Sequence, residues 1–541
     1  MSTENHTMGN SVLLWLAAAL GLALGAAAWA QHEHHHDAVA VDVDSEVGDV
    51  QFDADCQPAQ RSELDRALAL MHHMMYVQAR ASFAEIKSAD PDCAMAWWGV
   101  ATSLFQPLWG TRPDAAELER GRSAIERAGG AVNNAREAAL IKATAGFFDG
   151  PDDRAFRERM DAWIEGMATA YREFPDDADV ASLHALSLLT QAQWAEAAER
   201  DRLLDRAEVI LRDVWRERPQ HPGAIHYSIH ATDVDGRAEN ALDMVESYGR
   251  IAPHTAHALH MPSHIYVRLG DWEQVIDWNV RSADAALDQP ANGAVSHHYV
   301  HAIDYLIYAY LQQGRDRLAE RVYRETLAKG PHQASFVSAF HFAAMPARLA
   351  LEQRDWSRAA ALAVRDPDYL PWDQSQWAEA MSWFAIGMGR LKIGQLDEAE
   401  QALTRLSRLS DEAEALGETT MARFIEVDRL ILAGWFAQLS GQPKAGESLL
   451  RQAVDLEASV EKHPVTPGAL YPPREALGDL LLVQNSPEQA LDAYREADEI
   501  WPRRHNTYVG ALRAALAAGD SEAVLVYPVI NPVTFSESES A

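Results

Sequence analysis

Residues 219–253 read PQHPGAIHYSIHATDVDGRAENALDMVESYGRIAP, and this stretch contains the spacing that decides the fold. Ala241 is followed four residues later by Val245 and twelve residues later by Pro253. A small alanine lets two helices approach closely, a bulky apolar residue one turn later fills the space between them, and proline ends the second helix. The same spacing occurs five times: Ala79-Phe83-Pro91, Ala207-Leu211-Pro219, Ala241-Val245-Pro253, Ala319-Tyr323-Pro331 and Ala490-Tyr494-Pro502. The sequence therefore predicts an all-α fold built from helix pairs.

This repeat resembles the tetratricopeptide repeat (TPR) superfamily, whose unit has the 34-residue length that separates Pro219 from Pro253. The resemblance covers roughly residues 60 to 525 and implies an α-solenoid of antiparallel helix pairs, a right-handed superhelix with a concave groove. Three strings are similar to those of a group of exported bacterial TPR proteins that has no assigned activity. They are DCAMAWWG at 92–99, HPGAIHY at 221–227 and HALHMPSH at 257–264.

Composition and charge exclude several classes of protein. The chain of 541 residues is 48% hydrophobic and 23% charged, which excludes a disordered or fibrous protein. It contains 47 Lys plus Arg and 80 Asp plus Glu, a formal net charge of −33. Because a surface this negative repels phosphate backbones and attracts cations, we expect no nucleic-acid partner.

The two ends of the chain differ from its centre. Residues 1–30 contain an apolar run that ends in a small-x-small pattern before Gln31, which favours a signal peptide or an uncleaved membrane anchor. Either alternative predicts an exported, periplasmic or extracytoplasmic protein, with membrane contact only through this segment if it stays uncleaved. Residues 31–55 are expected to be a His-rich flexible segment, 56–527 the TPR-like solenoid and 528–541 an acidic tail. The histidines at 32, 34, 35 and 36 are either a loose collector of metal ions or part of a spacer.

The only cysteines are Cys56 and Cys93. An even pair in an exported protein favours a disulfide, which here would join the segment before the first helix to the end of the first helix pair. Thiol chemistry is not indicated, because there is no CxxC motif.

Ten of the 22 histidines lie between His221 and His301. His226, His230 and Asp233 are spaced i, i+4, i+7 and therefore share one helix face. His257, His260 and His264 share one face in the same way. The two sets are in repeat register, since His226 and His260 differ by 34 residues, as do His230 and His264.

The TPR resemblance implies that these side chains face the concave groove, together with His301 and Asp304. Imidazoles from neighbouring helices can meet at one ion, because packed helices lie roughly 8–10 Å apart. We therefore expect a transition-metal site. The ligand types leave Zn, Cu, Fe and Mn open as the metal, and the absence of thiolates argues against Cu(I) and against a structural Cys-type zinc site. The expected core of the metal site is His226, His230, His260 and His264, with Asp233, His257, His301 and Asp304 as further ligands or as acceptors that orient the ligands. Three further residues are expected to line the ligand groove: His72, Tyr308 and His341.

The alternatives concern what the groove does. A HExxH zinc protease is excluded, because Tyr227 follows His226 and Ala258 follows His257. The first hypothesis is a metal-binding protein or a metal-dependent enzyme of unknown substrate, with no residue singled out as a catalytic acid or base. The competing hypothesis is a non-enzymatic scaffold whose groove binds an extracytoplasmic peptide or protein.

Overall fold

The computed structural model describes residues 46–108, 112–374 and 376–527. Apart from two isolated bridges, Ala291 with Ala294 and Val295 with His332, the regular structure of these residues is helical. The prediction of an all-α fold is confirmed. The expected signal peptide at 1–30, most of the His-rich segment and the expected tail at 528–541 lie outside the described residues.

Helices follow one another along the described chain from residue 58 to residue 526. Their bounds are η1 Pro58–Gln60, α2 Arg61–His72, α3 Tyr76–Ala89, α4 Ala94–Thr102, α5 Ala115–Ala131, α6 Ala135–Phe148, α7 Phe156–Glu173, α8 Ala178–Ala192, α9 Ala197–Glu217, α10 Pro222–Thr232, η2 Ala238–Ala241, α11 Leu242–Ile251, α12 Ala256–His260, α13 Pro262–Leu269, α14 Trp272–Leu287, α15 His297–Gln312, α16 Asp316–Ala328, α17 Phe336–Glu352, α18 Trp356–Ala360, η3 Trp372–Gln374, α19 Gln376–Lys392, α20 Leu396–Ala415, α21 Thr419–Leu439, α22 Pro443–Glu457, α23 Pro473–Val483, α24 Pro487–Ile500, α25 His505–Ala518 and α26 Ser521–Val526.

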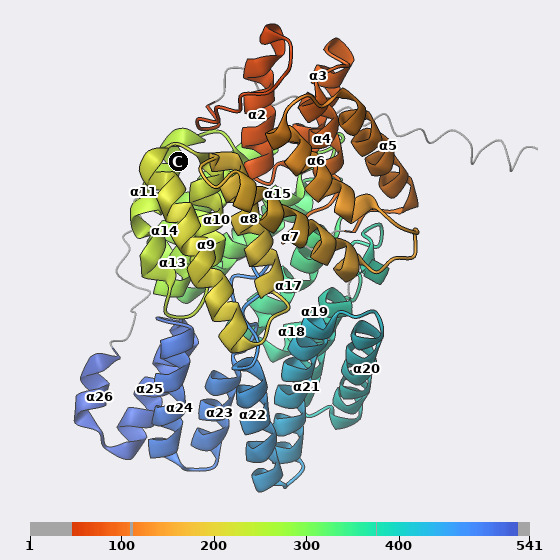
Figure 1. The fold of residues 1–541 in the computed structure, drawn as a ribbon. Helices are drawn as coiled ribbons and strands as arrows, with labels where there is room; N and C mark the ends of the chain where they lie inside the picture. Colours follow the sequence, from red (N-terminus) through yellow and green to blue (C-terminus); the bar gives the residue numbers. More distant parts are fainter. Residues whose placement is uncertain (1–45, 109–111, 375, 528–541) are drawn as a thin grey trace, which may run out of the picture. The chain divides into compact units, whose positions relative to one another are not determined.

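Each helix packs on the next helix in the chain, as α19, α20, α21 and α22 do (Figure 1). Many also pack on the next but one: α15 on α17, α17 on α19, α19 on α21 and α23 on α25. Stacked helix pairs require each helix to contact both the next helix and the next but one.

The five-fold Ala–bulky–Pro spacing has the local effect predicted for it. All five alanines are buried, and α3, α9, α11, α16 and α24 each end two or three residues before the corresponding proline. The bulky residue packs on a glycine where one is present. A Cβ on Gly99 would lie 2.4 Å from the ring of Phe83, and one on Gly510 would lie 2.3 Å from the ring of Tyr494. Glycine is therefore required where these aromatic rings meet the next helix.

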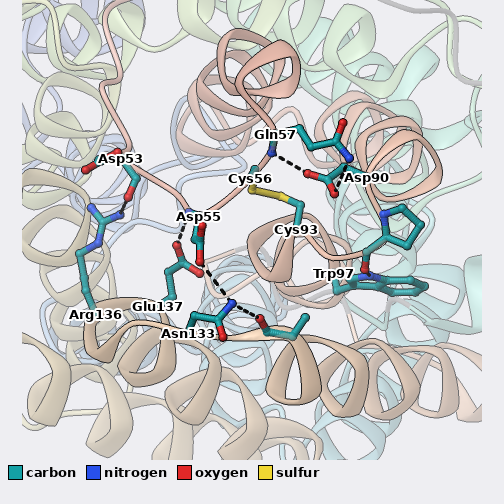
Figure 2. The surroundings of a disulfide bond; sticks show 12 residues. Asp53, Asp55, Cys56, Gln57, Asp90, Cys93, Trp97, Asn133, Arg136 and Glu137 are labelled. Atoms are coloured by element: carbon teal, nitrogen blue, oxygen red, sulfur yellow. Dashed lines mark hydrogen bonds between the residues drawn. A yellow bond between two sulfur atoms is a disulfide. The ribbon is translucent and has the colours of Figure 1, made fainter.

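Cys56 and Cys93 form a disulfide, as predicted (Figure 2). It joins the segment before α2 to the residue that precedes α4, across 37 residues of sequence. Hydrogen bonds surround it: the backbone N–H of Gln57 donates to Asp90 at 2.7 Å, and that of Asp55 donates to Glu137 at 2.8 Å. The bridge and these bonds attach the chain before α2 to α3, α4 and α6.

The HALHMPSH string contains a helix break. α12 ends at His260, and α13 begins at Pro262, which occupies the first helical position, where its missing N–H costs nothing. His260 and His264 therefore belong to two short helices. None of the described helices is long and apolar enough to span a membrane.

Candidate metal centre

Six histidines from α10, α12, α13 and α15 gather in two adjacent groups of three. In each group, one ring nitrogen of every member lies within 4.8 Å of those of the other two. The first group, called site A, is His226, His230 and His257. The second, called site B, is His260, His264 and His301. The four histidines expected at one point are thus divided between two sites, and His257 and His301 complete the two sets.

In site B, the Nε2 atoms of His260 and His264 face each other at 3.0 Å. His260 donates its Nδ1 proton to Asn279 Oδ1 at 2.7 Å, and His264 donates its Nδ1 proton to Asp233 Oδ2 at 2.9 Å. The orientation of Asn279 is set because its amide N–H donates to Val275 O at 2.7 Å. Both neutral rings therefore point an Nε2 lone pair at the same space, where the two lone pairs repel each other unless a cation lies between them.

The third member, His301, is oriented by a chain of hydrogen bonds from α17. The carboxylate of Asp304 accepts from His341 Nδ1 at 3.1 Å, so His341 Nε2 has a free lone pair. That atom accepts from His301 Nδ1 at 2.8 Å. His301 is therefore left with its Nε2 as an acceptor, like its two partners. Arg348 donates to the other oxygen of Asp304 at 3.1 Å and completes the chain.

The two aspartates of the expected ligand set act through histidines. Asp304 holds His341, and Asp233 holds His264 while it accepts from Arg268 at 2.9 Å and from Lys462 at 2.8 Å. Although burial opposes the effect, Lys462 and Arg268 keep the pKa of Asp233 well below its usual value. Against the effect of burial, Arg348 and His341 likewise lower the pKa of Asp304, so both carboxylates are ionised acceptors. Acceptors of this kind fix the tautomer and ring orientation of metal-binding histidines in proteins.

Site A is arranged in the same way by a backbone group. His226 donates its Nδ1 proton to the carbonyl of His72 at 2.7 Å, which leaves its Nε2 as an acceptor. The Nε2 atoms of His226 and His230 are buried and have no hydrogen-bond partner among the described residues. The ring of His257 lies 5.1 Å from that of His226, measured between centroids. Unpaired buried nitrogens are rare in folded proteins and point to a ligand.

Burial keeps all six rings neutral. It is the largest influence on each of them, and it lowers the pKa of His230 to about 3 and those of His226, His257, His260 and His301 well below the usual value. The pKa of His264 is also lowered by burial, with Asp233 opposing. A metal ion requires the neutral imidazole, so the site is in the correct protonation state across the physiological pH range.

One small cavity adjoins both sites. It has a volume of about 30 Å³, and its wall includes His230 and His257 of site A and His264 and His301 of site B. The remaining wall is His463 with five apolar residues: Leu108, Phe336, Val337, Pro464 and Val465. Since a water needs about 10–15 Å³, the cavity has room for one or two small species beside the ligand atoms of both sites.

The distances between the sites are short. Ring centroids of His230 and His264 are 6.1 Å apart, as are those of His257 and His260. Ions bound at the two sites would therefore be neighbours that share this cavity.

Two other clusters of potential ligands are already satisfied. His72 and His221 both contact Asp179 Oδ1, at 2.9 and 3.4 Å, and His72 also contacts the hydroxyl of Tyr227 at 3.1 Å. Cys56 and Cys93 lie near Asp90, but both sulfur atoms belong to the disulfide and are not available as ligands. His72, expected in the ligand groove, thus contributes to the centre through its backbone carbonyl.

Of the other expected groove residues, His341 is at the centre and Tyr308 is not. The Tyr308 hydroxyl accepts from Arg504 at 2.7 Å in a buried network with Glu352 and Glu475. Tyr305, one turn earlier, occupies the place next to the histidines. Its ring meets that of His260 edge-on at 4.5 Å, and its hydroxyl donates to the carbonyls of the segment around residue 465.

Several residues of the centre were not expected from the sequence, although helical spacing could have identified some of them. Tyr305 is four residues after His301, so its helical spacing places it on the ligand face. The ring centroids of His298 and His257 are 5.1 Å apart, and His298 lies one turn before His301 on α15. Asn279, Lys462 and His463 come from α14 and from the segment between α22 and α23, and no spacing in the repeat pattern connects them to the histidines.

Comparison with known proteins gives no assignment: neither a family model nor a curated protein matches this chain.

Proposed function

We propose that this protein is a metalloprotein that binds two first-row transition-metal ions in adjacent all-histidine sites. One observation carries the proposal: six histidines, five of them buried and His230 partly buried, form two sets, and the hydrogen bonds of at least four of them leave an Nε2 lone pair as an acceptor. The separation of 3.0 Å between the Nε2 atoms of His260 and His264 fits a common ion, because two nitrogens at about 2.0–2.1 Å from one ion are at most about 4.2 Å apart.

We further propose that the centre is catalytic and has open coordination positions. Structural metal sites are closed by four protein ligands, whereas catalytic sites usually keep three protein ligands and one exchangeable position. Each site here supplies three histidines, and the shared cavity of about 30 Å³ lies against ligands of both. Bound ions would act as Lewis acids or redox centres toward a small molecule in this cavity. Imidazole ligands suit Zn, Cu and Fe, and the lack of carboxylate ligands makes Mn the least suitable of the four expected metals.

The competing scaffold function needs side chains that a peptide can reach. The five ligands His226, His257, His260, His264 and His301 are between 0% and 6% exposed. This burial favours the metal-binding function over a peptide groove.

The fold and the compartment complete the proposal. The packing of each helix on the next and on the next but one supports a TPR-like solenoid of helix pairs. The Cys56–Cys93 disulfide supports an oxidising compartment outside the cytoplasm. A mature N-terminus at Gln31, read by N-terminal sequencing of the protein from its native host, would establish export with cleavage.

X-ray absorption at the metal edge tests the proposed function. The loaded protein should show only nitrogen or oxygen neighbours at about 2.0–2.1 Å, with the multiple-scattering pattern of imidazole. Addition of azide should change the spectrum, because the open positions accept a small anion. A sulfur shell, or a spectrum without imidazole features, would contradict the proposal. A spectrum that does not change when azide is added would contradict the open coordination positions.

A further inference from the structure

A second cavity, larger than the first, is lined by the segment that carries Lys462 and His463. Its volume is about 220 Å³, more than ten times what a water needs, so it has room for an organic molecule. His463 lines both cavities. The other walls come from α13, α19, α21, the end of α22, the segment up to Leu470 and the residues Asp235, Arg474, Ile500 and Trp501.

Aromatic rings form much of the apolar wall. Trp377 of α19 and Phe424 of α21 stack with centroids 4.8 Å apart and planes 21° apart. Trp501 also lines the cavity and donates its indole N–H to Glu457 at 3.2 Å. Stacked indole and phenyl faces bind flat apolar groups and attract cations through their negative π faces.

The basic residues of the wall are already paired. Arg268 and Lys462 both donate to Asp233, at 2.9 and 2.8 Å, and Arg474 donates to Glu457 at 2.9 Å. None of these three cations is left to receive an anionic ligand.

The carboxyl of Asp428 on α21 also belongs to the wall of this cavity. It makes no ion pair or hydrogen bond with any described residue. Burial, with a smaller contribution from Glu457, raises the pKa of Asp428 to about 8, as expected for a carboxyl without a counter-charge. A bound cation would supply that counter-charge and stabilise the carboxylate.

We infer that this cavity is a binding site for a small organic cation, with Asp428 as the counter-ion of its ammonium group and Trp377, Phe424 and Trp501 around its apolar part. The inference is independent of the metal centre, because none of these four residues belongs to site A or site B. A primary arylalkylamine matches the wall, since its ammonium can pair with Asp428 and its ring can pack against the aromatic side chains of the wall.

Calorimetric titration of the metal-free protein tests this site, with phenethylamine as the probe. The matched ligands are 2-phenylethanol, which has the same shape without the charge, and phenylacetate, which reverses the charge. The amine should bind at least tenfold more tightly than either. Equal affinity for amine and alcohol, a preference for phenylacetate, or no binding of phenethylamine would overturn the inference.

A pair of variants locates the site. Asp428→Asn removes the charge at constant shape and should weaken phenethylamine binding at least tenfold, whereas Asp455→Asn, on the exposed face of α22, should leave it unchanged. Unchanged binding by the Asp428→Asn variant would overturn the assignment of the counter-ion. Because the ligand comparison uses the wild-type chain, the inference stays testable even if a variant does not fold. Because no metal is present, the result is also separate from that of the proposed function.

Discussion

At the scale of single residues, the centre depends on which ring nitrogen of each histidine carries the proton. Asn279, Asp233 and His341 each accept a hydrogen bond from the Nδ1–H of one histidine of site B, and this leaves the three Nε2 atoms as acceptors. Asn279 is the simplest of the three to test, because it is neutral and its removal leaves no buried charge.

Asn279→Ala should reduce the metal affinity of site B by about 10- to 100-fold, the usual effect of losing a partner that orients a ligand. The physical reason is that the ring of His260 would no longer be held by its Nδ1 hydrogen bond. Competition titration against a chromophoric chelator measures the affinity of each site. Ser282→Ala is the matched control, since Ser282 is also buried on α14 but donates to Ala256 O. An affinity equal to that of the control would argue against the assigned tautomer.

The pH dependence of stability is also decided by single buried histidines. His73 is fully buried between the hydroxyl of Tyr248 and the carbonyl of Val47, and burial lowers its pKa from 6.5 to about 3. Between pH 6.5 and 3 the unfolded chain therefore binds one more proton at this residue than the folded protein. Stability must fall as the pH falls through this window, by about 1.4 kcal/mol per pH unit for His73 alone.

Urea unfolding of the metal-free protein at several pH values between 4 and 6.5 measures this slope. His73→Gln keeps a hydrogen-bonding side chain without a titratable group and should make the slope shallower by about 1.4 kcal/mol per pH unit. A variant with the same slope as the wild type would show that His73 is protonated in the folded protein.

At the scale of helices and covalent links, the sequence predicted the helix ends better than it predicted how the histidines group. Alanine, bulky residue and proline determine where α11 and α16 end, because their effects are local. The i, i+4 spacing likewise placed His226 and His230 on one face. It did not predict that His260 and His264 would lie on two helices, since that depends on the break at Pro262.

The disulfide is a covalent cross-link between the segment before α2 and the start of α4. Replacing Cys56 and Cys93 by alanine should lower the free energy of unfolding of this region by about 4 kcal/mol, because the bridge closes a loop of 37 residues in the unfolded chain. Urea unfolding followed by the tryptophans near α4 reports the change. A loss below about 1 kcal/mol would show that the bonds of Asp90 and Glu137 hold the segment without the bridge.

At the scale of the whole described chain, the centre is closed by a segment far away in sequence. Lys462 reaches Asp233 across 229 residues, and Tyr305 donates to Pro464 O across 159. Arg348 donates to Gly468 O of the same segment at 3.3 Å. This segment forms walls of both cavities. Repeat patterns describe neighbours in sequence, so they contain no information about closure by this segment, and the concave groove predicted from the sequence did not include it.

The most direct test of the central claim is the metal content of the purified protein, measured by elemental analysis without an affinity tag. The background variant should have His32, His34, His35 and His36 changed to Asn, so that this tract contributes no metal. After exposure to Zn, Cu, Fe and Mn in turn and removal of loose ions, we expect two ions per chain for the best metal. Adding His257→Ala or His264→Ala should leave one ion, because each removes a ligand of one site only. His184→Ala is the matched control, a buried histidine outside both sites, and should keep two. Two ions in every variant, or no bound metal in any of them, would contradict the account.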